Sequence, residues 1–135
     1  MNVLKVFEGE LSVQLLTAAI LAILFLQSGL DKVFDWKGNL GWLQGHFAKS
    51  MLKSVVPILL FIITIFEIAA GLVSAIGLIL LFTSGDTTFA MLGAQLAALS
   101  IVMLFFGQRI AKDYAGAATL VPYFILAIFG ILILS

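Results

Sequence analysis

The sequence contains no cysteine, a single histidine and only two prolines in 135 residues. Without cysteine the chain cannot form disulfide bonds, iron–sulfur clusters or thiolate zinc sites, and it has no thiol redox chemistry. The single histidine, His46, cannot by itself supply a histidine-based metal site or a pair of haem ligands. No metal site is therefore expected in this chain.

Charge is scarce as well. Only 10% of the residues are charged, the formal net charge is zero, and 63% of the residues are hydrophobic, with a mean hydropathy of +1.24. A soluble domain of this length needs more charge to cover its surface, and a neutral chain has no electrostatic basis for binding nucleic acid. A Walker loop, GxGxxG, HExxH and a serine nucleophile motif are all absent. The composition indicates one compact membrane domain.

Four apolar segments separated by short polar connections predict an all-α membrane protein. The spans are expected at about residues 11–30, 55–82, 89–107 and 117–134. A helix of about 20 residues crosses a hydrocarbon core of about 30 Å. Ahead of the first span, Lys5 is accompanied by Glu8 and Glu10, which is not the basic leader of a cleaved signal, so we expect this span to be retained. The short connections predict an antiparallel four-helix transmembrane bundle forming a single domain over residues 1–135.

The connection between the first two spans, residues 33–54, holds both tryptophans, a residue type that favours the membrane interface. Its apolar residues recur at helical spacing, at Leu40, Leu43, Phe47 and Met51. This pattern predicts an amphipathic helix lying in the interface, with Asn39 as its N-cap.

Basic residues gather in the first and third connections. They are Lys32, Lys37, Lys49, Lys53, Arg109 and Lys112. The positive-inside rule places these connections in the cytoplasm and both termini on the periplasmic side.

Small and polar residues mark the helix faces that are expected to point into the bundle. In the second span this stripe consists of Thr64, Glu67, Gly71, Ser74 and Gly77. In the fourth span it consists of Gly116, Thr119, Tyr123, Ala127 and Gly130. Small residues let helices approach closely in lipid.

Glu67 lies near the middle of the second span, where a charged side chain costs roughly 2.5–3.5 kcal/mol by insertion scales. It can carry protons, hydrogen-bond a quinone or bind an ion, or it can be a structural carboxylate that fixes helix packing. Gln95 lies at a similar depth in the third span and is its expected partner. Gln27 and Lys32, at the end of the first span, complete this candidate polar site. Lys32 either reaches back to an anionic head group, a quinone carbonyl or a carboxylate, or extends its ammonium to the interface.

Five further residues on the same predicted side can form a polar mouth. They are Asp31, His46, Arg109, Lys112 and Tyr114. The alternative is a basic loop that only sets orientation and binds anionic lipid.

The chain resembles the DoxX family of small four-helix bacterial membrane proteins. The resemblance lies in Gln27-Ser28-Gly29-Leu30-Asp31-Lys32 at the end of the first span, and in Glu67-x-x-x-Gly71 with Gly77 in the second. The family's basic residue near the start of the first span has only Lys5 as a counterpart here. The resemblance implies a bacterial cytoplasmic membrane location and association with redox systems, since relatives include a quinone-linked thiosulfate oxidoreductase subunit.

The leading hypothesis is an accessory subunit of a redox-linked membrane complex, not catalytic alone, with a polar pocket for a quinone or a lipid head group. Its expected partners are membrane lipids and either other membrane subunits or further copies of the chain. One alternative is a quinone-reactive oxidoreductase subunit in which Glu67 or His46 moves protons. Another is a small oligomeric transporter or channel with Glu67 in the permeation path.

Overall fold

The computed structural model describes residues 9–135, and within that range every regular element is a helix. Lys5 and Glu8 lie outside the described residues. The long helices are α1 (Gly9–Phe34), α3 (Val56–Ser84), α4 (Thr88–Ile110) and α6 (Val121–Leu134). The short ones are α2 (Trp36–His46), the 3-10 turn η2 (Lys53–Val55) and α5 (Tyr114–Thr119).

Each of the four predicted apolar segments is helical and is long and apolar enough to cross a membrane. The fourth such segment, Tyr114–Leu134, combines α5 and α6. Large apolar side chains remain exposed along these helices, for example Leu16, Ile23 and Leu132, each about 70% exposed. Such a surface suits lipid, which solvates it without the cost of exposure to water. The prediction of a four-helix membrane protein is confirmed at this level.

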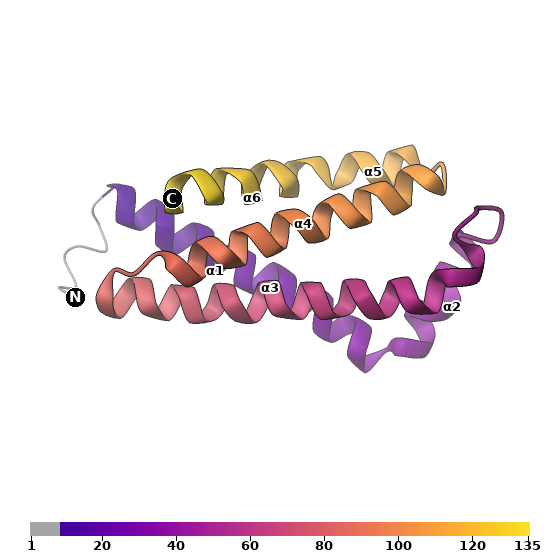
Figure 1. Cartoon of the computed structure of the whole chain (residues 1–135), viewed down its shortest axis with the longest axis horizontal. Coiled ribbons are helices and arrows are strands. Elements are labelled where there is room, and N and C mark those ends of the chain that lie inside the picture. The colour runs from indigo at the N-terminus through magenta and orange to yellow at the C-terminus, as the bar shows by residue number, and fades with distance from the viewer. Residues whose placement is uncertain (1–8) are drawn as a thin grey trace.

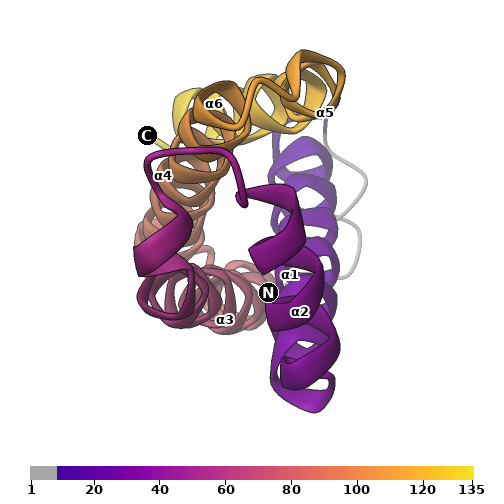
Figure 2. The same ribbon diagram turned by 90° about the vertical axis from the view of Figure 1, so that its right-hand side faces the viewer.

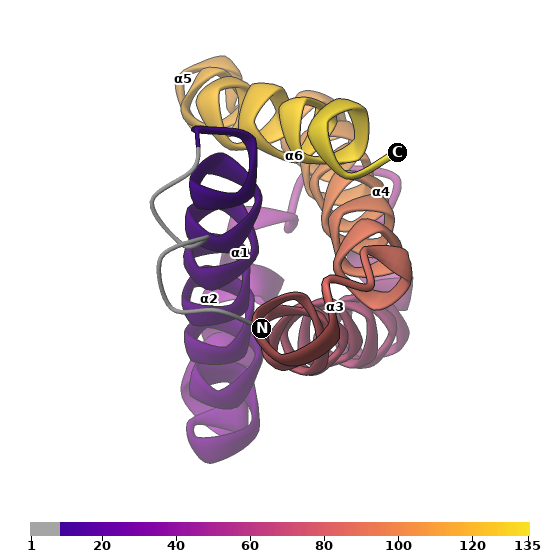
Figure 3. The same ribbon diagram turned by 90° about the vertical axis from the view of Figure 1, so that its left-hand side faces the viewer.

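Successive long helices run in opposite directions along the molecule (Figure 1). Viewed from either end, α1, α3, α4 and α6 follow one another around the bundle (Figures 2 and 3). Helix α3 packs most extensively against α1 and α4, whereas α6 packs mainly against α4. The connection between α1 and α3 and the connection between α4 and α6 lie at the same end of the molecule (Figure 1).

Glycines set the closest approaches of α3. A β-carbon added at Gly71 would lie 2.6 Å from the Leu26 backbone nitrogen in α1, and one at Gly29 would lie 2.6 Å from Cγ1 of Ile68. On the other side of α3, a β-carbon at Gly77 would meet the backbone of Ala90 in α4. All five residues of the predicted stripe on the second span are buried, so that prediction is confirmed.

The stripe predicted for the fourth span is wrong in its first half. Thr119 and Tyr123 are exposed, while Ala127 and Gly130 are buried. The segment is not one continuous helix, because α5 ends at Thr119 and α6 begins at Val121, with a proline in its first turn. Thr119 lies before this break, and Tyr123 lies in the first turn of α6, where residues 121–123 are all exposed, so burial begins only further along α6.

The helix predicted between the first two spans begins and ends earlier than expected. Its N-cap is Asp35 rather than Asn39, and the side chain of Asn39 donates to the backbone oxygen of Asp35 at 2.9 Å. The helix ends at His46, and residues 47–52 continue as turns and a bend. As a result Met51 is 81% exposed, although Phe47 is buried.

One link between α1 and α6 was not predicted from the sequence. The Gln14 amide donates to the backbone oxygen of Ile133 at 2.8 Å. The last carbonyls of a helix have no partner inside it, so this contact satisfies one of them at the end of α6. A signal was present in the sequence, since Gln14 lies three residues before Thr17, which is buried on the same helix.

Candidate functional site

The central polar feature is an ion pair between α1 and α3. Nζ of Lys32 lies 3.1 Å from Oε2 of Glu67. The Glu67 side chain is only 1% exposed, and that of Lys32 is 17% exposed. Lys32 also donates to the Ser28 hydroxyl at 3.0 Å and lies 3.4 Å from the Ser28 backbone oxygen. Of the partners that the sequence offered for Lys32, the structure therefore shows the carboxylate.

The crossing of α1 and α3 explains why these two residues meet. Gly29 packs beside Ile68 and Gly71 packs beside Leu26, so the last turns of α1 lie level with the middle of α3. Glu67 follows the start of α3 at Val56 by 11 residues, or about 16 Å along the axis. Lys32 lies in the last turn of α1, and its long side chain reaches across from there to the Glu67 carboxylate.

The second carboxylate oxygen of Glu67, Oε1, is buried and makes no hydrogen bond within the described part of the chain. The same holds for the hydroxyl of Ser74, two turns further along α3. Ser100 in α4 is fully buried, but its hydroxyl bonds to the Leu96 backbone oxygen. A buried acceptor without a donor costs about 1–3 kcal/mol, so Oε1 is a place where an added donor would stabilise the site.

The predicted pairing of Glu67 with Gln95 is wrong. Gln95 is exposed, because the buried side of α4 consists mainly of its small residues and does not include position 95. Gln27 is also exposed and lies away from the ion pair, in a hollow between α1 and α6 that it shares with Tyr123. Gln95 was assigned by its depth and Gln27 by its position at the end of the first span, and neither criterion specifies which side of a helix a residue occupies.

A second polar cluster joins α2 to the last turn of α4 and to the connection after it. Nε2 of His46 lies 2.7 Å from Oε1 of Gln108 and 3.5 Å from Oδ2 of Asp113. The other oxygen of Asp113 accepts from the Gly116 backbone at 2.8 Å and so caps α5. The ring of His46 stacks on Trp42 with centroids 4.6 Å apart. The cluster holds two connections together at one end of the bundle.

The other residues of the predicted mouth do not join this cluster. The guanidinium of Arg109 stacks over the Tyr114 ring, 4.4 Å from its centroid. Lys112 is exposed and has a positive φ of 60° at the end of α4. Asp31 is exposed at the end of α1. The residues predicted to form one mouth therefore make separate sets of contacts, with His46 bound to Gln108 and Asp113, and Arg109 stacked on Tyr114.

Among residues 9–135, no group of three or more histidine, aspartate or glutamate side chains is placed to hold a metal ion. No family model, no curated protein and no solved structure matches the chain. The function of the chain is therefore inferred from the contacts of Lys32 and Glu67.

Proposed function

We propose that the chain is an integral protein of the bacterial cytoplasmic membrane that holds the head group of a quinone or a lipid beside the Lys32–Glu67 pair. In this proposal its four spans are antiparallel and α2 lies in the membrane interface. The protein acts as an accessory subunit of a redox-linked membrane complex. The first and third connections face the cytoplasm, as their basic residues favour.

The observation that carries this proposal is the half-satisfied carboxylate of Glu67. Oε2 is bound to Lys32, while Oε1 is buried without a donor in the described residues. A hydroxyl group, such as that of a quinol or of a lipid head group, supplies the missing donor. Lys32 retains some exposure, so a ligand that approaches along the end of α1 can reach the pair.

A role as a subunit is supported by what the sequence lacks. The chain has no cysteine and one histidine, so it cannot bind an iron–sulfur cluster or a bis-histidine haem by itself. Electron transfer through a bound quinone then requires a partner that carries the redox centre. The resemblance to the DoxX family supports the same reading.

The test is to compare the molecules that remain bound to the wild type and to Glu67→Gln after purification in mild detergent. Quinones and lipids are extracted and quantified per protein by mass spectrometry. We expect the wild type to retain one more quinone or lipid molecule per chain than Glu67→Gln, in which occupancy of this site should fall about tenfold, since a hydrogen bond to a charged group contributes about 1.5–3 kcal/mol.

The matched control is Glu10→Gln, which removes an exposed carboxylate from the first turn of α1. This variant should retain the ligand. Circular dichroism first establishes that both variants are folded. Equal retention by the wild type and Glu67→Gln would contradict the proposed site.

A further inference from the structure

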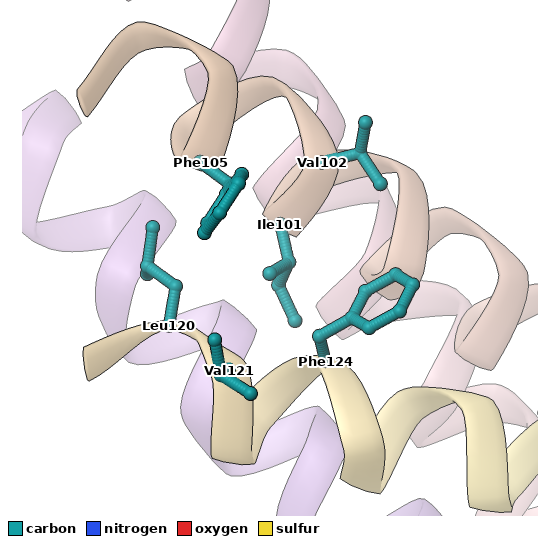
Figure 4. Close-up of a pocket in the computed structure, with 6 residues that line it drawn as sticks. All are labelled: Ile101, Val102, Phe105, Leu120, Val121 and Phe124. Atoms are coloured by element: carbon teal, nitrogen blue, oxygen red, sulfur yellow. The ribbon is translucent and has the colours of Figure 1, made fainter. Parts of the chain in front are cut away.

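A second site lies on the outer face of the bundle, away from the Lys32–Glu67 pair. A hollow of about 180 Å³ lies between α4 and the start of α6. Its lining is entirely apolar: Ile101, Val102, Phe105, Leu120, Val121 and Phe124. Figure 4 shows Ile101 and Phe105 of α4 facing Leu120 and Phe124 across the hollow. Val102 and Val121 are 49% and 43% exposed, so the hollow is open to the surroundings of the bundle.

A positive charge lies about one helical turn beyond the lining of this hollow along α4. Arg109 follows Phe105 by four residues and Val102 by seven, so the three share one face of α4. Arg109 is exposed, and its guanidinium is held over the ring of Tyr114, at the start of α5. Within residues 9–135 it forms no ion pair. Lys112, also exposed, adds a second positive charge to the same connection.

The nearby carboxylate does not neutralise this charge directly. Asp113 directs one oxygen to the Gly116 backbone and the other toward His46. The guanidinium therefore keeps its hydrogen-bond donors for an external anion, and its planar group suits a phosphate.

We propose that this face binds one anionic phospholipid, with its phosphate on Arg109 and a section of an acyl chain in the hollow. The apolar lining extends over about one turn of α4, from Ile101 to Phe105, directly before the arginine. This order of charge followed by apolar surface matches the order of head group and chain in a phospholipid. The proposal requires that the bundle lies in a membrane, but it is independent of the function proposed for Lys32 and Glu67.

Native mass spectrometry of the full chain, exchanged into micelles containing equal phosphatidylglycerol and phosphatidylcholine, tests the proposal. We expect the wild type to retain phosphatidylglycerol preferentially. Arg109→Gln should lower this preference about fivefold, which corresponds to roughly one basic contact near a membrane surface. Lys49→Gln removes an exposed lysine from the other connection and should leave the preference unchanged.

The hollow is tested by Val121→Trp, which fills it from an exposed position that tolerates a larger side chain. We expect this variant to retain less of both lipids. The proposal is overturned if the wild type shows no preference, or if Lys49→Gln lowers the preference as much as Arg109→Gln. Unchanged retention in Val121→Trp would show a phosphate contact without a seated chain, which would also overturn it.

Discussion

At the scale of single residues, the Lys32–Glu67 pair determines how a buried carboxylate is tolerated between α1 and α3. Glu67 is almost completely buried, while Lys32 is partly exposed. Taking both charges out of water is costly, so the pair contributes little net stability, whereas removing one partner leaves the other buried and uncompensated.

We therefore predict that Lys32→Met destabilises the protein by about 3–5 kcal/mol. The double variant Lys32→Met with Glu67→Leu should recover most of this loss, because it leaves no buried charge. Reversible unfolding in mixed detergent micelles measures both changes. If the double variant is no more stable than Lys32→Met, the loss comes from packing rather than from the orphaned carboxylate.

Asp86 governs a smaller contact in the turn between α3 and α4. Its Oδ1 accepts hydrogen bonds from the backbone nitrogen of Thr88 at 3.0 Å and from the Thr88 hydroxyl at 2.7 Å. These bonds favour the charged carboxylate and lower the pKa of Asp86 below its usual value. A group with a lowered folded-state pKa stabilises the fold above its unfolded pKa, and that contribution is lost as the pH falls through the folded value.

The expected result is a melting temperature at neutral pH that is higher for the wild type than for Asp86→Asn, which keeps the acceptor oxygen but cannot ionise. This difference should close as the pH falls below the usual range for aspartate and through the lowered pKa of the folded carboxylate, where the group becomes protonated. A difference that stays constant over this range would mean that the charge of Asp86 does not contribute to stability.

The residue scale is where sequence reasoning was least complete. Glu67 was identified because a carboxylate within an apolar span is conspicuous. Its partner was assigned to Gln95 by depth, but the buried face of α4 is defined by Gly93, Ala94 and Ala97, which turn Gln95 outward. For Lys32, the sequence suggested an anionic head group, a quinone carbonyl or a carboxylate as the partner. The crossing of α1 and α3 identifies this partner as the carboxylate of Glu67.

At the scale of helices, the packing of α3 depends on its glycine residues. Gly71 brings the α3 backbone against Leu26 of α1. The nearest atom of Leu26 is its backbone nitrogen, which cannot move aside without shifting the whole of α1. Leu against Leu gains little over Leu against lipid, so close backbone approach is the main source of packing energy in a membrane.

We predict that Gly71→Ala destabilises the bundle by about 1–3 kcal/mol, since the added β-carbon would lie 2.6 Å from the Leu26 nitrogen. The control is Gly41→Ala in α2, where no atom lies within 4 Å of the added carbon. That change should be neutral or stabilise the helix by up to about 1 kcal/mol. Thermal unfolding of both variants in one detergent compares them, and equal stability would contradict this account of the contact.

Helix positions were predictable because long apolar runs dominate the pattern. The spans and the buried stripe of α3 followed from the sequence. The break between α5 and α6 did not, although Pro122 marks it, because proline is tolerated within many membrane helices. The start of α2 was misplaced because Asp35 and Asn39 are both suitable caps and lie one turn apart.

At the scale of the whole molecule, one polar side chain on the outer surface points to association. Gln95 is exposed on α4, and its amide makes no hydrogen bond within the described residues. An amide both donates and accepts, so two copies of the chain can satisfy each other across a two-fold axis. Interhelical bonds of this kind contribute about 0.6–2 kcal/mol in membranes.

We predict that Gln95→Leu weakens self-association of the chain at least about threefold. The other exposed glutamine, Gln27, provides the control, and Gln27→Leu should associate like the wild type. Energy transfer between labelled copies in liposomes measures the effect at several protein-to-lipid ratios. Equal weakening by the two substitutions, or none by Gln95→Leu, would rule out this interface.

The most direct test of the proposed function is the composition of the complex that the protein forms in its own membrane. The tagged chain is recovered in mild detergent, and the accompanying proteins and lipids are identified by mass spectrometry. An accessory subunit should bring down a larger membrane complex in a fixed ratio, together with a quinone or lipid that Glu67→Gln loses. Recovery of the chain alone, or only as a homo-oligomer, would contradict the proposed accessory role.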